Sequence, residues 1–103
     1  MTKDIETYAS GNWKVKDGSE GEFLQRWTEF LEWTKQAAPG LTSASLIRDA
    51  ENPRHFVSFA EWKDEGSRKG WQSHEEFPAK LSRCRELCDE FVGGSYDLAA
   101  RVS

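Results

Sequence analysis

Residues 8–31, which read YASGNWKVKDGSEGEFLQRWTEFL, contain a change of hydrophobic period that indicates the fold. In the first part apolar and polar side chains alternate, with Trp13 and Val15 on one face, which is the period of a β-strand. After Gly18 the apolar residues recur at the spacing of one helix face. We therefore predict a strand over residues 5–16, followed by a helix that lies on a sheet.

The predicted helix has a start signal, a stop signal and one apolar stripe. Ser19 and Glu22 have the spacing of a capping box, and Pro39-Gly40 is a stop signal. The stripe consists of Phe23, Leu24, Trp27, Phe30, Leu31 and Thr34. Trp33 falls off this stripe. Because so large a ring is seldom solvated alone, we expect Trp33 at the rim of a cleft or over an exposed surface.

A β-hairpin and a short charged segment follow. Strands are predicted over residues 41–48 and over residues 54–62, the second of which is rich in Phe and Val, and the turn-forming cluster 49–53 joins them. Segment 64–71 is interrupted by two glycines, which are poor helix formers. We expect this segment to be a loop or a weak helical turn, and a candidate lid or rim.

The last third of the chain predicts a second helix and a final strand. Ser73 and Glu76 have the spacing of another capping box, although Pro78 can delay the regular part of the helix. One apolar stripe consists of Phe77, Leu81, Cys84, Leu87, Cys88 and Phe91. Gly93-Gly94 is expected to break the helix, and residues 96–102 alternate as a strand.

The predicted element order is β-α-β-β-α-β. This is an α+β, ferredoxin-like plan in which both helices cover one face of an antiparallel sheet. We expect a single domain over residues 1–103. The other face of the sheet would leave a large apolar surface uncovered, and a second copy of the chain is the simplest cover, so we expect a homodimer.

Composition excludes several classes of function. With 37% hydrophobic and 31% charged residues, the chain has the composition of a globular protein. The net charge is -4 and no run of Lys or Arg is longer than two, which argues against nucleic acid as a partner. No apolar stretch approaches the roughly 20 residues needed to cross a bilayer, and no leader-like N-terminus is evident, so we expect no membrane partner and a cytoplasmic location.

The cysteines and histidines do not suggest a metal site. Cys84 and Cys88 are four apart in the predicted helix, which places their Cα atoms near the upper limit for a disulfide. His55 and His74 have no ligand-like spacing to them or to each other. We interpret the cysteines as core thiols and expect neither a metal nor another cofactor.

Three segments resemble the antibiotic biosynthesis monooxygenase family of dimeric α+β barrel proteins, several of which act on aromatic polyketides or on haem. The segments are residues 10–18 leading into Phe23 and Trp27, then Pro39-Gly40, then residues 56–62 followed by Trp71 and Phe77. The resemblance implies a dimeric α+β barrel with a pocket between the helices and the sheet. Because one fold hosts many functions, the residues must be compared individually.

The polyketide-oxidising members of this family have a Trp at the end of strand three, an Asn earlier in that strand and a Tyr after it. The matching positions here hold Trp62, Ser58 and Arg68. One of the three family residues is therefore retained.

The haem-degrading members have an Asn on strand one, a Trp after strand three and a His further along. Asn12 and Trp71 look similar, but Lys80 and Leu81 occupy the positions where the His would fall. Neither can bind iron as a neutral imidazole does. His74 comes too soon after Trp71, so a haem-degrading role is disfavoured.

The first hypothesis is a cofactor-independent monooxygenase that acts on a planar aromatic, polyketide-like small molecule. Trp62 and Trp71 would form the walls of a stacking slot, and Asn12 or Ser58 would anchor a polar group of the substrate. His74 is the candidate general base. Arg68 would pair with an anionic group of the ligand.

Each of these residues also has a structural interpretation. The two tryptophans could be core, Asn12 a solvated strand residue, His74 a solvated first-turn residue and Arg68 part of a surface ion pair. The alternative function is therefore a non-catalytic small-molecule-binding or accessory protein, which the missing Asn and Tyr favour. A haem-binding protein is a third, less favoured hypothesis.

Overall fold

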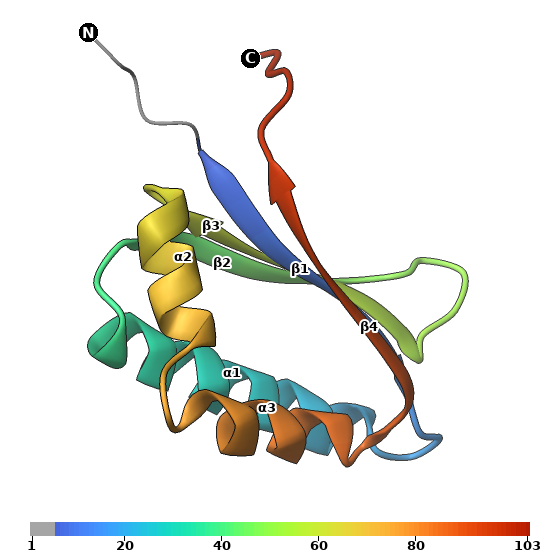
Figure 1. The fold of residues 1–103 in the computed structure, drawn as a ribbon. Helices are drawn as coiled ribbons and strands as arrows, with labels where there is room; N and C mark the ends of the chain where they lie inside the picture. Colours follow the sequence, from blue (N-terminus) through green and yellow to red (C-terminus); the bar gives the residue numbers. More distant parts are fainter. Residues whose placement is uncertain (1–5) are drawn as a thin grey trace, which may run out of the picture.

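A computed structural model describes residues 6–103. It contains one sheet of four antiparallel strands in the order β2-β3-β1-β4, with three helices on one face (Figure 1). Along the chain the elements are β1 (Thr7–Val15), α1 (Glu20–Ala37), β2 (Leu41–Arg48), β3 (His55–Trp62), α2 (Glu65–Gln72), α3 (Phe77–Arg85) and β4 (Cys88–Asp97). This arrangement confirms the predicted α+β, ferredoxin-like fold, with one more helix than the sequence indicated.

β1 is an interior strand, because it pairs with both β3 and β4. Its side chains alternate as predicted: Trp13 and Val15 are buried under the helices, whereas Asn12 and Lys14 are exposed on the opposite face. The part of the predicted strand that includes residue 5 lies outside the described residues. The hairpin of β2 and β3 also agrees with the prediction.

α1 follows β1 as predicted, but without the capping box. Ser19 is the N-cap residue and makes no side-chain cap hydrogen bond. Glu22 pairs instead with Arg26 on the next turn, so its carboxylate is not available to complete the box. The helix ends at Ala37, and Gly40 adopts a φ of 115° in the connection to β2, a conformation that favours glycine.

The expectation of a loop or a weak helical turn over residues 64–71 is wrong, because α2 is a complete helix of eight residues. The Asp64 side chain caps it by accepting a hydrogen bond from the Ser67 backbone N–H at 2.7 Å. The helix also buries Arg68 and Trp71. The cap and this burial offset the low helix propensity of the two glycines.

The start of α3 also differs from the predicted capping box. Pro78 lies in the first turn of the helix, which follows the expectation of a delayed start, and Glu76 is the N-cap residue. The side chain that serves the turn before the helix is His74, whose Nδ1 accepts the Glu76 backbone N–H at 3.1 Å. Ser73 closes α2 rather than opening α3.

The last strand begins much earlier than predicted. α3 ends at Arg85 and β4 runs over Cys88–Asp97, so Cys88 and Phe91 do not continue the helix, and the strand predicted over residues 96–102 is wrong. A β-bulge in the β1–β4 pairing separates the partner of Cys88, Val15, from the rest of the ladder. Because of this bulge, Cys88 and Phe91 both pack against the core although they are three residues apart. A spacing of three is also typical of one face of a helix, which is why these residues were assigned to the helix.

The face of the sheet opposite the helices is open in the single chain. Ile47, Val92 and Tyr96 are 52%, 57% and 58% exposed there. Within the described residues 6–103, no helix combines the length and the apolar character that crossing a membrane requires.

Candidate functional site

A cavity of about 270 Å³ lies between the sheet and the helices. Its floor consists of two neighbouring rows of small residues across the central strands. In one row Ala9 of β1 is opposite Ala60 and Ser95, and in the next Gly11 is opposite Ser58 and Gly93. All of these residues line the cavity. The sheet is therefore flat where a ligand would lie on it.

Large residues flank this flat floor. On one side Trp13 lies between Phe56 and Phe91 in the strand register, and the ring centroids of Trp13 and Phe91 are 4.2 Å apart. On the other side Trp62 pairs with Thr7, and both are fully buried. The cavity exists because two rows of small side chains separate these larger ones.

Gly11 cannot carry a side chain in this arrangement. A Cβ atom there would lie 2.7 Å from Trp13 Nε1 and 3.0 Å from Ser58 Oγ. Those two atoms form a buried hydrogen bond of 3.0 Å, in which the indole donates to the hydroxyl. The missing side chain at position 11 thus permits the contact that fixes the Trp13 ring at the floor.

The roof of the cavity is aromatic and aliphatic. α1, α2 and α3 contribute Trp27, Phe30, Leu31, Trp71, Gln72, Phe77 and Leu81. Trp71 is held firmly, because its Nε1 donates to Thr34 Oγ1 at 2.9 Å and its ring stacks on Phe30 at 5.7 Å. A planar ligand would therefore lie between a flat floor and a rigid aromatic roof.

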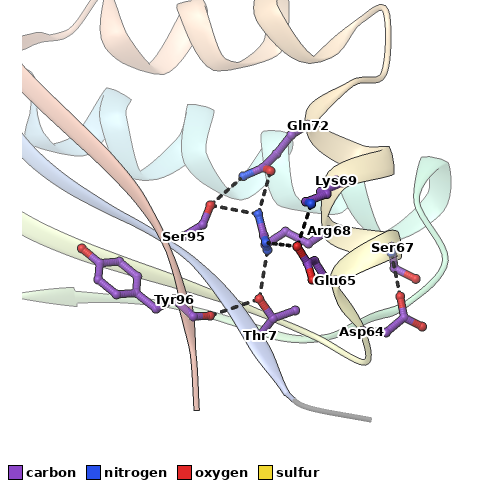
Figure 2. A network of polar contacts seen from close by, with 9 residues as sticks. All are labelled: Thr7, Asp64, Glu65, Ser67, Arg68, Lys69, Gln72, Ser95 and Tyr96. Carbon is purple, nitrogen blue, oxygen red and sulfur yellow. Dashed lines mark hydrogen bonds and ion pairs between the residues drawn. The ribbon is translucent and has the colours of Figure 1, made fainter. Parts of the chain in front are cut away.

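One end of the cavity is lined by polar residues, whose hydrogen bonds with Arg68 are drawn in Figure 2. Gln72 of α2 and Ser95 of β4 line it, and both accept hydrogen bonds from Arg68 Nη1, at 3.0 and 2.9 Å. Arg68 itself is buried behind them and does not line the cavity.

The structure brings some of the predicted site residues together. Ser58 and Trp71 line the cavity. Trp62 does not line it but packs behind Trp71, with ring centroids 5.0 Å apart. Its Nε1 is buried and, among residues 6–103, has no hydrogen-bond partner. Arg68 contacts the cavity only indirectly, by donating a hydrogen bond to Gln72, which lines it.

Asn12 lies elsewhere, which corrects the expectation that it faces the helix–sheet cleft. It is exposed on the opposite face of the sheet, and its Oδ1 is 3.0 Å from His55 Nε2. Nδ1 of the same His55 ring is 3.0 Å from Asp49 Oδ2. This hydrogen bond with His55 is the main cause that holds the pKa of the Asp49 carboxyl below its ordinary value.

His74 also lies outside the residues that line the cavity. Its ring meets Trp33 edge-on at 5.1 Å, and Lys80 Nζ lies 5.6 Å from the centre of the same indole. Trp33 is half-buried by these contacts and by Phe30, as expected for an indole at a rim. His74 Nδ1 is already occupied by the hydrogen bond from the Glu76 backbone N–H.

Sequence reasoning missed Gln72 and Ser95 as cavity residues. Gln72 follows a segment that was predicted to be a loop, and Ser95 precedes the strand predicted over residues 96–102. A usable signal was present, because Phe91, Gly93 and Ser95 have the alternation of one strand face.

The described residues offer no cluster of three or more His, Cys, Asp or Glu side chains that could hold a metal ion. The free thiols are also unsuited to nucleophilic chemistry. Burial raises the pKa of Cys84 to about 12 and that of Cys88 to about 11. Both thiols are therefore protonated at neutral pH.

The model of the antibiotic biosynthesis monooxygenase family matches residues 8–80, which is more than half of the 103-residue chain. The chain belongs to the antibiotic biosynthesis monooxygenase family. No curated protein matches the sequence. The family match covers the floor residues of β1 and β3 and the roof residues of α1 and α2, whereas β4 with Ser95 lies beyond it.

Solved structures share the fold of this monooxygenase-family chain. A conserved protein from Methanosarcina mazei Go1 is 24% identical with a TM-score of 0.78, and the match covers 89% of this chain and 91% of that one. SnoaB, a cofactor-independent oxygenase from Streptomyces nogalater, is 18% identical with a TM-score of 0.78, and the match covers 96% of each chain. At these identities the likeness shows the fold alone.

Proposed function

We propose that the chain is a cofactor-independent monooxygenase that binds a planar aromatic small molecule in the cavity between sheet and helices. The observation that carries the proposal is the shape of the cavity, in which a floor of small residues faces the rings of Trp71 and Phe30. Family membership and the likeness to a cofactor-independent oxygenase support the reaction type.

The size of the cavity limits the ligand. Its volume of about 270 Å³ is close to the lower end of the range of about 300 to 1,000 Å³ that ligand pockets occupy. Anthrone-like or naphthol-like compounds, with two or three fused rings, are therefore the proposed substrate class.

The chemistry needs only the substrate and O₂. Deprotonation of a phenol or enol gives an electron-rich anion that reacts with O₂. Where the reacting carbon carries two hydrogens, one oxygen atom becomes its carbonyl oxygen and the other leaves as water with both hydrogens. The substrate supplies the electrons, and the protein contributes orientation and electrostatic support.

The test combines binding with oxygen uptake. Tryptophan fluorescence should quench saturably with 1-naphthol or anthrone, and O₂ should be consumed as the product gains one oxygen atom and loses two hydrogens. Ala9→Leu, which fills the floor, should weaken binding by about tenfold or more. Gln25→Leu, which adds the same group on the exposed surface of α1, should leave binding unchanged.

Two further variants separate the cavity from general adsorption. Trp62→Ala should weaken binding by about 1 to 3 kcal/mol, because Trp62 supports the Trp71 roof. Trp33→Ala should do much less, because Trp33 does not line the cavity. Equal losses in the two variants would mean that the fluorescence reports surface adsorption, and the cavity assignment would be withdrawn.

A second candidate function is a non-catalytic binding or accessory protein. It is favoured by one observation: among residues 6–103, none of the side chains that line the cavity is a carboxylate, an imidazole, a phenol or an amine. A general base within reach is therefore lacking at the cavity surface. Saturable binding without oxygen uptake would support this second function over the first.

We also propose that a second copy of the chain covers the open face of the sheet. The exposed side chains of Ile47, Val92 and Tyr96 lie on that face. Large apolar side chains that gather on one face of a sheet are typical of a protein–protein contact surface. A two-fold interface would bury the same patch on both copies.

A further inference from the structure

Arg68 carries a buried positive charge that has no close counter-ion within the described chain. The residue is 7% exposed. Its only carboxylate partner among residues 6–103 is Glu65, whose Oε1 lies 3.9 Å from Nη2. The same oxygen is 2.7 Å from Lys69 Nζ, so it is shared with a second cation. A buried charge is costly unless it is compensated.

Neutral oxygen atoms hold the guanidinium instead. Nε donates to Thr7 Oγ1 at 2.9 Å, and Nη1 donates to Gln72 Oε1 and Ser95 Oγ (Figure 2). Thr7 Oγ1 in turn donates to the Tyr96 backbone carbonyl at 3.1 Å. These groups solvate the cation but leave its net charge intact beside the cavity.

The network determines which groups at the polar end of the cavity donate hydrogen bonds and which accept them. Because Gln72 Oε1 accepts from Arg68, the side-chain amide must present its NH₂ group on the other side. That NH₂ group lies 3.4 Å from Ser95 Oγ. Ser95 Oγ therefore accepts from both residues, and its own hydrogen must be donated elsewhere. Gln72 keeps a second amide hydrogen and Ser95 keeps its hydroxyl hydrogen, so both can donate to a ligand in the cavity that they line.

We propose that this polar end selects the anionic form of an aromatic ligand, whose phenolate or carboxylate oxygen accepts hydrogen bonds from Ser95 and Gln72. Arg68 is a positioning residue that orients both donors and supplies the compensating charge from behind them. Hydrogen bonds to an ionised acceptor are stronger than those to a neutral one. The inference rests on the proposed function, because it assumes that an aromatic ligand occupies the cavity.

Matched ligands test the charge preference. We would measure dissociation constants for 2-naphthoate and for 2-naphthamide, which have the same ring and nearly the same shape but differ in charge. The wild-type protein should bind the naphthoate about tenfold tighter or more. Arg68→Gln should abolish this preference by weakening the naphthoate alone, and Arg68→Lys should retain part of it.

A second measurement separates charge selection from loss of fold. Bound 2-naphthol should have its pKa lowered by about one, which corresponds to a tenfold preference for the phenolate, as measured by the absorption band of the naphtholate. Ser95→Ala, a small change at an exposed position of β4, should reduce this effect without changing the circular dichroism spectrum. Comparison of 2-naphthol with 2-naphthoate shows whether the polar end of the cavity prefers phenolates and carboxylates alike.

The outcomes distinguish the two proposals. Equal affinity for naphthoate and naphthamide would overturn the inference but leave the aromatic cavity intact. Equal weakening of both ligands by Arg68→Gln and Ser95→Ala would also overturn it, because it would indicate a structural role only. If neither ring bound, the proposed function would fail, and the inference would fail with it.

Discussion

At the scale of single residues, the site depends on which side chains are absent as much as on those present. Gly11 lies where Trp13 and Ser58 meet, and any Cβ would enter their hydrogen bond. The neighbouring floor residues are equally small. Cavity shape is therefore set by side-chain volume in two cross-strand rows.

Gly11→Ala should lower the free energy of unfolding by about 1 to 3 kcal/mol, because the added methyl group must displace the Trp13 ring from a close-packed floor. Urea unfolding, monitored by circular dichroism, measures this change in the free energy of unfolding. Gly21→Ala is the matched control: nothing lies within 4 Å of its Cβ position on α1, so this change should stabilise by about 0.5 to 1 kcal/mol. Unchanged stability of Gly11→Ala would contradict the described floor.

The two thiols should react slowly in the folded protein. Their pKa values are raised, to about 12 for Cys84 and about 11 for Cys88, first by burial. Each thiol is therefore protonated below these values, and thiolate appears only as the pH rises through them. A chromogenic disulfide reagent at pH 8 should label them far faster in guanidinium chloride than in buffer. Fast labelling of the folded protein would contradict this.

At the scale of elements, α2 joins the two functional regions of the cavity. Its eight residues place Trp71 in the roof and Arg68 in the polar network. The N-cap residue of this helix is Asp64, whose carboxylate accepts a hydrogen bond from the Ser67 backbone N–H (Figure 2). Loss of the cap should therefore disturb both regions together.

Asp64→Ala should lower the free energy of unfolding by about 0.5 to 2 kcal/mol, and Asp64→Asn by much less, because Asn caps almost as well. The Ser67 backbone hydrogen bond lowers the pKa of Asp64 below its ordinary 3.8. The cap therefore stabilises fully above that value and is lost as the pH falls through the lowered pKa. Unfolding curves between neutral and acidic pH should show this loss in the wild type but not in Asp64→Asn.

The elements also show how far the sequence predicts the fold. β1, α1 and β3 were predictable because each keeps one hydrophobic period from end to end. β2 was predictable from the turn signals on both sides of it, although a register shift between Leu41 and Ser43 interrupts its alternation. α2 was not, because its stability comes from a cap and from the burial of Arg68 and Trp71 rather than from helix propensity. β4 was not predictable, because its bulge lets Cys88 and Phe91 face the core at a spacing of three residues, which is also the spacing of a helix face.

The same reasons explain how much of the site was predictable. Ser58 and Trp71 were found because they were predicted to face a cleft between sheet and helices, and they line it. Gln72 and Ser95 were not predicted as site residues, because the elements that contain them, α2 and β4, were not predicted either. Asn12 was expected in the cleft because a polar residue inside a strand suggested one, although its alternation with Trp13 already placed it on the opposite face.

At the scale of the whole molecule, the two faces of the sheet have different roles. The helices enclose the cavity on one face, whereas the other face leaves Ile47, Val92 and Tyr96 exposed. The Asp49–His55–Asn12 chain lies on this second face and links β3 to β1 and to the turn after β2. The cavity and the surface of the proposed dimer contact therefore lie on opposite faces of the sheet.

Size-exclusion chromatography with light scattering should return twice the chain mass of 11.8 kDa. Val92→Lys should shift the protein towards the monomer, because it places a charge among the exposed apolar side chains of the open face. Thr28→Lys, on an exposed position of α1, should leave the dimer intact. A wild-type monomer at micromolar concentration would refute the proposed pairing.

The closeness of Trp62 and Trp71 has an optical consequence. Their ring centroids are 5.0 Å apart and the planes are inclined by 34°. Electronic transitions of two indoles at this separation couple, and they give a pair of circular dichroism bands of opposite sign that isolated indoles lack. Because Trp71 lines the cavity, a ligand stacked on it perturbs the couplet. A change in this couplet on addition of an aromatic compound would therefore report binding next to Trp71.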